Sequence, residues 1–183
     1  KSLMLSHILL KLAENHGWRI AIFSPEHSTA MHIRRILQVY VGQGFDEDMY
    51  DRMSKDEMAA GLRFINDHFF FIETKDAVPS VDLIMNISKS FVYKYGSAAQ
   101  GSGIVIDPYN EVDPSRSQGK REDEHIRDFI SECKKFARLH NAVVWCVAHP
   151  TKLPKEQDGS FSPPSSYQIS GSSHWANMAD VIA

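Results

Sequence analysis

Glu26, Asp107 and His149 are the residues of this sequence best placed to do chemistry, because each follows an apolar segment. The three segments are 18–23, 104–106 and 142–148. In an open parallel sheet, ligands bind beyond the carboxyl ends of the strands, so these side chains are expected at one edge of such a sheet. A polar residue that ends a strand is often only a turn residue, but three of them in one chain favour a shared site. Two carboxylates and an imidazole can hold a metal ion or position a water molecule for hydrolysis.

Lys1 and Ser2 suggest a phosphate-binding function. A phosphate-binding loop ends in Gly-Lys-Ser/Thr and opens a helix; its backbone N–H groups and its lysine hold phosphates, while the hydroxyl binds Mg²⁺. Lys1-Ser2 directly precedes a segment whose apolar residues have helical spacing. The dipeptide alone is a weak signal, and the glycines that would confirm it are not in the sequence. Asp107, after an apolar strand, fits the acidic residue that acts on Mg²⁺ in such sites and gives the dipeptide more weight.

Apolar strands alternate with amphipathic helices along the chain. Ser28 or Thr29 can cap a helix, Ser54 with Glu57 forms a capping box, and Ser80 can cap a further helix. The expected helices are 3–16, about 29–40, about 54–66, about 81–95, 122–140 and about 173–179, and the expected strands are 18–23, 69–72, 104–106 and 142–148. This alternation predicts an α/β fold in which a mostly parallel sheet is covered by helices on both faces.

Four further segments complete the predicted organisation. Residues 42–53 are rich in turn formers, 109–121 is expected to be an exposed loop, and 150–168 is expected to be a long mobile loop. Residues 181–183 resemble the start of a strand. Since the sequence shows no internal repeat and no second domain, residues 1–183 are expected to form a single domain that is truncated at both ends.

The composition narrows the class of protein. The chain has 183 residues, 43% of them hydrophobic, which is enough for one sizeable core. The formal net charge is −3, so any contact with nucleic acid must come from a local patch. Cys133 and Cys146 lie in apolar segments and are expected to be reduced thiols of an intracellular protein. The longest apolar runs, about seven residues, are too short to span a bilayer, and no signal peptide is visible.

Five stretches together resemble the helicase core of the RecA/DnaB superfamily of P-loop NTPases. More narrowly, they resemble its primase-helicase branch, which comprises phage replicative helicases and Twinkle-type organellar helicases. The stretches are Lys1-Ser2, FSPEH at 23–27, GIVIDPYNEVD at 103–113, VVWCVAHP at 143–150 and YQISGSSHWANMADVIA at 167–183. Their order and spacing match the successive motifs of the family over almost the whole chain, and the resemblance implies a RecA-like fold.

The resemblance implies a role for each residue that matches a nucleotide-site motif. Lys1 corresponds to the lysine of the phosphate loop, Ser2 to its Mg²⁺-binding hydroxyl and Asp107 to the Walker-B aspartate. Glu26 corresponds to the glutamate that polarises the attacking water. His149 corresponds to the residue that senses the γ-phosphate and couples it to the DNA loops.

The resemblance also implies DNA contacts from two later segments. Lys152 and Lys155 fall in a loop that faces the central channel of the ring, although they are equally well explained as solvated charges. Ser172 and Ser173 belong to the final motif, also near DNA.

The final motif departs from the family pattern at one point. Many relatives carry a basic residue in it, where this chain has His174-Trp175. Trp175 could stack on a base, but packing in the core is favoured. The arginine finger of the family lies outside this sequence.

The implied function is that of an ATP-dependent DNA helicase motor domain. Such a domain uses ATP and Mg²⁺ to translocate on single-stranded DNA and to unwind it at replication forks, and it self-associates into a ring, expected to be a hexamer. Weak activity is expected of this segment alone, and a primase domain in the same chain is left open. A bacterial or phage-infected cytoplasm and an organellar matrix are both compatible with it. Alternatives are a RecA-type recombinase or regulatory ATPase, a metal-dependent hydrolase with Glu26, Asp107 and His149 as ligands, and a non-catalytic nucleic-acid-binding module.

Overall fold

The computed structural model describes residues 2–45, 52–74, 78–96, 101–112, 121–151, 155, 160–171 and 173–183. These residues form a four-stranded parallel sheet with the strand order β2-β1-β3-β4. The strands are β1 (Arg19–Phe23), β2 (Phe69–Phe71), β3 (Ser102–Ile106) and β4 (Ala142–Cys146).

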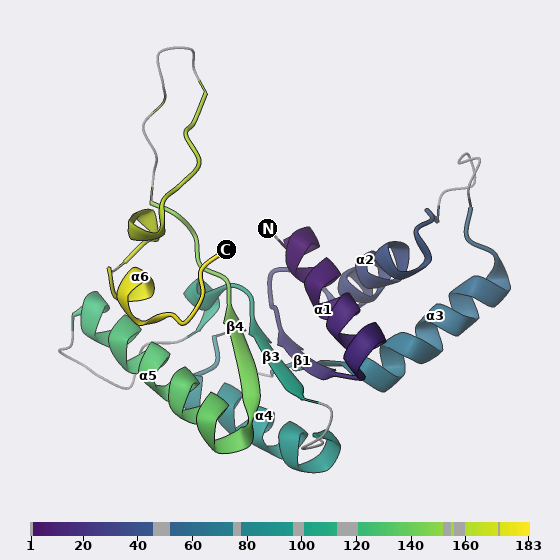
Figure 1. The fold of residues 1–183 in the computed structure, drawn as a ribbon, viewed down its shortest axis with the longest axis horizontal. Coiled ribbons are helices and arrows are strands. Elements are labelled where there is room, and N and C mark those ends of the chain that lie inside the picture. Colours follow the sequence, from purple (N-terminus) through teal and green to yellow (C-terminus); the bar gives the residue numbers. More distant parts are fainter. Residues whose placement is uncertain are drawn as a thin grey trace.

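Helices cover both faces of this sheet (Figure 1). One face carries α1 (Ser2–His16), α2 (Thr29–Val41) and α3 (Lys55–His68), and the other carries α4 (Val81–Tyr95), α5 (Glu122–His140) and the short α6 (His174–Met178). The predicted α/β fold, with a parallel sheet between two helical layers, is confirmed. None of the helices that the structure describes combines the length and the apolar character that a membrane span requires.

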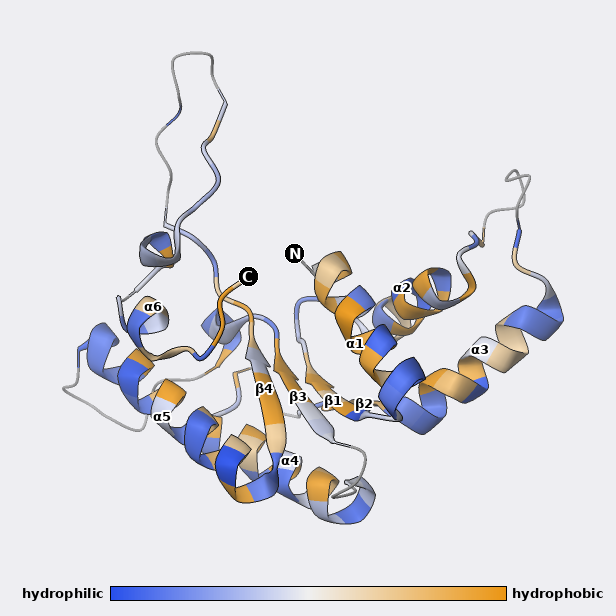
Figure 2. Cartoon of the chain, viewed as in Figure 1, coloured by the Kyte–Doolittle hydropathy of each residue, from blue (hydrophilic) through white to orange (hydrophobic). Residues whose placement is uncertain are grey.

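The central strand β1 shows why these segments are almost continuously apolar. Ile20 and Ile22 pack into the core under α1, α2 and α3, whereas Ala21 and Phe23 pack into the cores on the opposite face. Because successive side chains of a strand point to opposite faces, a strand covered on both sides needs apolar residues at every position. Figure 2 shows the strands as a hydrophobic layer, with hydrophilic residues on the outer surfaces of the helices.

Short polar side chains start three of the helices, as predicted. Ser28 accepts a hydrogen bond from the backbone N–H of Met31 at the start of α2. Ser54 and Glu57 form the expected capping box at the start of α3, and Ser80 caps α4. These contacts satisfy N–H groups that have no partner within their own helix.

The structure differs from the expected boundaries at three places. Strand β3 begins at Ser102, two residues earlier than predicted, because Ser102 and Gly103 pair with β1 on one side and β4 on the other. Helix α3 continues to His68, two residues further than predicted. The strand predicted to start at 181–183 is not formed: these three residues are exposed and pair with no described strand.

The predicted irregular loop at 150–168 is more ordered at its described ends than expected. Thr151 N–H donates to the carbonyl of Gln168 at 2.7 Å, and Ser170 N–H donates to the carbonyl of His149 at 2.9 Å. An antiparallel bridge further out pairs Lys155 with Phe161. These pairings define a hairpin-like arm, residues 150–169, whose described parts extend away from the sheet in Figure 1.

Candidate functional site at the carboxyl edge of the sheet

Backbone hydrogen bonds extend the sheet beyond its formal strand ends and fix the spacing of the site. Asp107 N–H donates to the carbonyl of Phe23 at 3.0 Å, so Asp107 lies beside the end of β1. Val147 N–H donates to the carbonyl of Ile106 at 2.9 Å, and Tyr109 N–H donates to the carbonyl of Val147 at 2.8 Å. The segments that follow β1, β3 and β4 therefore leave the sheet side by side.

Glu26 and His149 meet at this edge, although they are far apart in the sequence. Oε1 of Glu26 lies 3.6 Å from Nε2 of His149, within the range of an ion pair but longer than a good hydrogen bond. The two side chains remain 43% and 52% exposed, respectively, so both can reach a ligand in solution. The structure thus brings together two of the three residues singled out for chemistry.

Asp107 occupies a more enclosed position between them in the sheet order. Its residue is only 8% exposed, and it directly follows β3, the strand between β1 and β4. A carboxylate held at the end of a central strand is fixed by the backbone on both sides. Asp107 is thus the most rigidly placed carboxylate of this edge.

Lys1 lies outside the described residues, so its predicted phosphate contact is not tested by the structure. Ser2 is the first residue of α1, but the position of its side chain is also outside what the structure describes. The start of α1 lies at the same end of the sheet as the carboxyl ends of β1 and β4 (Figure 1). This placement puts the positive end of the α1 dipole on the side of Glu26, Asp107 and His149.

The residues predicted to contact DNA are only partly described. Lys152 and Ser172 fall outside the described residues. Lys155 is exposed on the arm, where its Nζ lies 5.8 Å from the centre of the Phe161 ring. Ser173 is exposed at the start of α6. The structure does not bring Lys155 and Ser173 into direct contact with the Glu26–His149 pair by any described interaction.

Trp175 packs in the core, as favoured from the sequence. It is 6% exposed, its Nε1–H donates to the carbonyl of Ser170 at 3.1 Å, and its ring packs against Tyr109 and Phe129. Stacking of Trp175 on a nucleic-acid base is therefore excluded in this conformation. Its role is to fix the end of the arm against α5.

His32 is a residue of this region that the sequence analysis missed. It is 9% exposed on α2, and it hydrogen-bonds the backbone of Ser24, two residues before Glu26. Burial lowers the pKa of His32, so the ring is neutral near pH 7. The signal in the sequence was its position on the buried stripe of α2, one turn before Ile36.

The three edge residues do not form a transition-metal site of the kind expected for a metal-dependent hydrolase. Among the residues that the structure describes, no group of three or more His, Cys, Asp and Glu side chains is arranged to hold a metal ion. This observation weighs against Glu26, Asp107 and His149 acting together as metal ligands.

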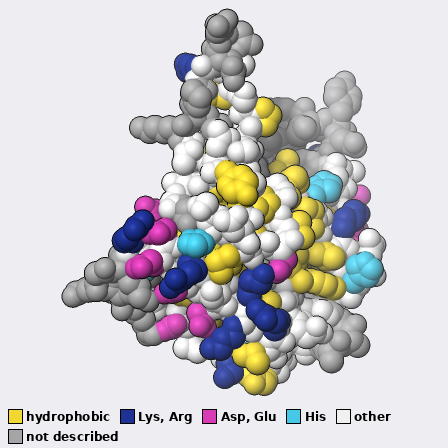
Figure 3. All heavy atoms as spheres, turned by 60° about the vertical axis from the view of Figure 1, so that its left-hand side comes forward, with side chains coloured by type: hydrophobic (Ala, Val, Ile, Leu, Met, Phe, Trp, Pro, Cys, Tyr) yellow, Lys and Arg dark blue, Asp and Glu magenta, His cyan; other side chains and the backbone are white. Residues whose placement is uncertain are grey.

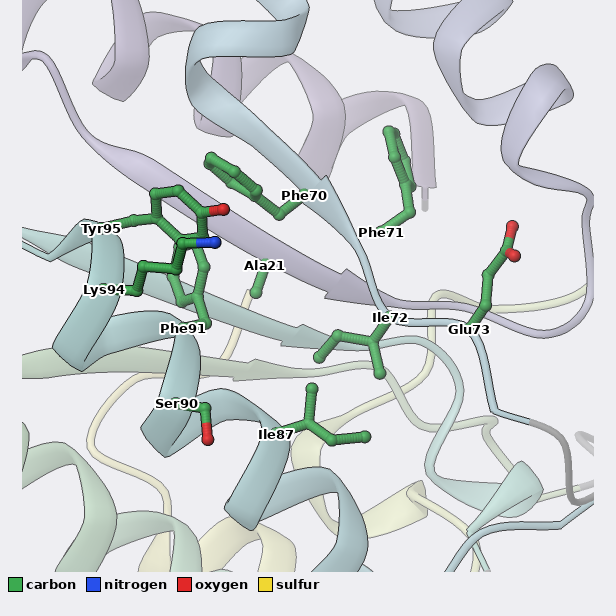
Figure 4. Close-up of a pocket in the computed structure, with 10 residues that line it drawn as sticks. All are labelled: Ala21, Phe70, Phe71, Ile72, Glu73, Ile87, Ser90, Phe91, Lys94 and Tyr95. Atoms are coloured by element: carbon green, nitrogen blue, oxygen red, sulfur yellow. The ribbon is translucent and has the colours of Figure 1, made fainter.

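Surface features elsewhere do not compete with this edge as a site. Figure 3 shows positive and negative side chains interspersed over one face, as expected for a net charge of −3. A mainly apolar cavity of about 300 Å³ opens between the edge strand β2 and α4, lined among others by Phe70, Phe91 and Tyr95 (Figure 4). It contains none of Glu26, Asp107 and His149.

Comparison with known proteins supports the same assignment. No family model matches the chain. The chain is 34% identical, over 98% of its residues, to the Twinkle homolog protein, chloroplastic/mitochondrial, of Arabidopsis thaliana, and it spans a quarter of that protein's length.

Two solved structures share the fold. The first, the ATPase domain of a DnaB-like helicase, aligns with 98% of this chain and 64% of its own, with a TM-score of 0.75 and 17% identity. The second, a DnaB-like replicative helicase from a structure that describes its interactions with primase, aligns with 84% of this chain and 41% of its own, with a TM-score of 0.62 and 16% identity. At these identities the likeness concerns the fold. The resemblance inferred from the sequence is confirmed: this chain is Twinkle-like and has the RecA-type fold of DnaB-like helicase ATPase domains.

Proposed function

We propose that this chain is the ATP-hydrolysing motor domain of a replicative DNA helicase. The observation that carries the proposal is the 3.6 Å contact between Glu26 and His149 at the edge where Asp107 also ends a strand. Phosphoryl transfer to water needs little covalent chemistry from the protein, but it does need an oriented water molecule and well-placed charges. An exposed carboxylate beside an imidazole and a fixed aspartate is suited to that task.

In this proposal Glu26 and His149 act on the reacting end of ATP. Glu26 orients and polarises the attacking water, for which an exposed, ionised carboxylate at a strand end is suitable. His149 contacts the γ-phosphate. Because Ser170 N–H is bonded to the carbonyl of His149, a shift of His149 would be transmitted directly to the base of the arm.

Lys1, Ser2 and Asp107 hold the phosphates and Mg²⁺ in this proposal. The chemistry of the donors fits the ion, because Mg²⁺ prefers hard oxygen ligands such as the Asp107 carboxylate and the Ser2 hydroxyl. When bound, Mg²⁺ offsets the charge of the phosphate oxygens. Lys1 offsets further charge on the same oxygens.

Single-stranded DNA is the proposed track. Lys152 and Lys155 on the arm, together with Ser172 and Ser173 after it, would contact the DNA backbone. Contacts of this kind depend on phosphate charge, so binding should weaken steeply as salt concentration rises.

The proposed assembly is a ring, expected to be a hexamer, in which residues 1–183 act as one RecA-like domain. A primase domain in the same chain is compatible with the proposal. The printed name of the Arabidopsis relative places that protein in chloroplasts or mitochondria. An organellar matrix is accordingly one proposed location, beside a bacterial or phage-infected cytoplasm.

The test is DNA-stimulated ATP hydrolysis by the full-length protein that contains this segment. Glu26→Gln is expected to lower kcat about 100-fold or more, because it removes the group that positions water. Nucleotide affinity should be retained. Glu132→Gln is the matched control, since Glu132 is an exposed carboxylate beside Lys135 on α5, away from the edge.

The outcomes separate the alternatives. Full activity of Glu26→Gln would refute the proposed mechanism. DNA binding without nucleotide turnover in the unsubstituted protein would favour a non-catalytic binding module. ATP-dependent strand pairing without unwinding would favour a recombinase.

A further inference from the structure

His32 is an unusual side chain because it is buried, polar and only half satisfied. It is 9% exposed, and its Nε2 atom has no hydrogen-bond partner among the described residues. Native proteins pair nearly all buried polar atoms, so an exception at the edge of a candidate site needs an explanation.

The other ring nitrogen of His32 has a clear structural task. The hydrogen bond between His32 and the backbone of Ser24 favours the protonated ring, which identifies it as an N–H donating to the carbonyl. Since Nε2 has no partner, the donor is Nδ1. Ser24 begins the turn that carries Glu26, so Nδ1 fixes that turn to α2.

The neighbours of His32 hold the ring in place and leave Nε2 as an acceptor. The ring stacks on Phe71, with centroids 6.0 Å apart and an interplanar angle of 27°, and lies 5.8 Å from the ring of His27. Burial, together with the nearby His27 and Arg35, lowers the pKa of His32 more than Asp107 raises it. A neutral ring that donates from Nδ1 carries a lone pair on Nε2.

Asp107 identifies the direction from which a partner could come. Its backbone N–H is bonded to Phe23, the residue before Ser24, and its charge acts on His32. Ser24, His32 and Asp107 therefore share one corner of the carboxyl edge, on the side of the sheet covered by α2. The missing partner of Nε2 is a hydrogen-bond donor, because the neutral nitrogen can only accept.

We propose that Nε2 of His32 accepts a hydrogen bond from an ordered water molecule that enters this corner with the bound nucleotide, beside Asp107. His32 is then a positioning residue: one nitrogen holds the turn that carries Glu26, and the other senses whether the nucleotide site is filled. This inference rests on the proposed ATPase function and adds a residue to that site.

The test uses the full-length protein and its affinity for ADP and for a non-hydrolysable ATP analogue, each with Mg²⁺. His32→Asn is the informative variant, because an asparagine amide can still donate to Ser24 but has no atom at the position of Nε2. It is expected to weaken binding about three- to tenfold, the effect of one hydrogen bond. Its melting temperature should stay close to that of the unsubstituted protein.

His68→Asn is the matched control. His68 also bonds a backbone carbonyl through Nδ1, that of Trp18 at 2.8 Å, and its ring packs on Phe64, but it lies at the opposite end of the sheet. It should leave nucleotide affinity unchanged. Equal affinity losses in the two variants, or none in His32→Asn, would overturn the proposal.

A nucleotide-bound structure decides the matter independently if His32→Asn fails to fold. The expected result is a water oxygen about 2.7–3.2 Å from Nε2 of His32. A dry Nε2 would refute the inference. Neither result bears on the Glu26→Gln test, so the proposed ATPase function stands or fails separately.

Discussion

Gly103 offers a sharp test of the packing that holds β3, the strand that ends in Asp107. A Cβ atom at this position would lie 2.6 Å from Cζ3 of Trp145 and 3.3 Å from Cγ1 of Ile20. The Trp145 ring is itself packed against Trp18, with centroids 6.0 Å apart. Because an indole is rigid, it cannot yield by bending its end, and the whole ring or the strand must move.

The expected cost of Gly103→Ala follows from two opposing effects. Overpacking a well-filled core costs about 1–3 kcal/mol. Alanine also restricts the unfolded chain, which returns about 0.4–1 kcal/mol. The net loss is therefore about 1–2 kcal/mol, which in a protein of this size lowers the melting temperature by roughly 2–8 °C.

Thermal unfolding of Gly103→Ala, Trp145→Phe and the double variant measures this directly. A phenylalanine ring is smaller than the indole and lacks the carbon that would clash. The double variant should therefore lose less stability than the sum of the two single changes, by about 1 kcal/mol. Strict additivity, or a Gly103→Ala protein as stable as the original, would refute the reasoning.

Two further predictions concern backbone conformation and pH. Gly171 has φ +95°, and a Cβ there would lie 2.5 Å from Cδ1 of Ile126, whereas Gly42 has φ +77° and no atom within 4 Å; Gly42→Ala should cost about 1 kcal/mol and Gly171→Ala clearly more, and equal melting temperatures of the two variants would contradict this. Burial raises the pKa of Tyr109 to about 12, against about 10 in an unfolded chain. Between those pH values the unfolded chain has lost a proton that the folded chain keeps, so the free energy of unfolding should fall as pH rises, by up to about 1.4 kcal/mol per pH unit. Urea titrations should show a flatter slope for Tyr109→Phe, although Cys133, whose pKa burial also raises to about 12, contributes over the same range; an unchanged slope would count against the assignment.

The strand-end residues could be predicted because a parallel sheet aligns the carboxyl ends of its strands. Glu26 and His149 are 123 positions apart in the sequence (149 − 26), yet they lie 3.6 Å apart in the structure. No local pattern shows this proximity. It follows from three apolar segments and one rule of topology.

Other features depend on tertiary context that a local pattern does not contain. Ser102 and Gly103 have weak strand propensity, but strands on both sides supply their hydrogen bonds. The pairing of Lys155 with Phe161 joins residues within a segment rich in proline and serine, which local rules assign to irregular structure. His32 occupies a buried position of α2 where a helical pattern calls for an apolar residue, so the pattern conceals its polar role.

The weakness of the Glu26–His149 contact makes this site easier to test. Both side chains are more than one-third exposed, so their pairing contributes at most about 1 kcal/mol to stability. Their positions are imposed by the buried strands and by backbone bonds such as Asp107 to Phe23 and Val147 to Ile106. Removing either side chain should therefore leave the edge intact. A large loss of ATP hydrolysis in Glu26→Gln, without a comparable loss in melting temperature, would then report the missing chemical group and not a damaged fold.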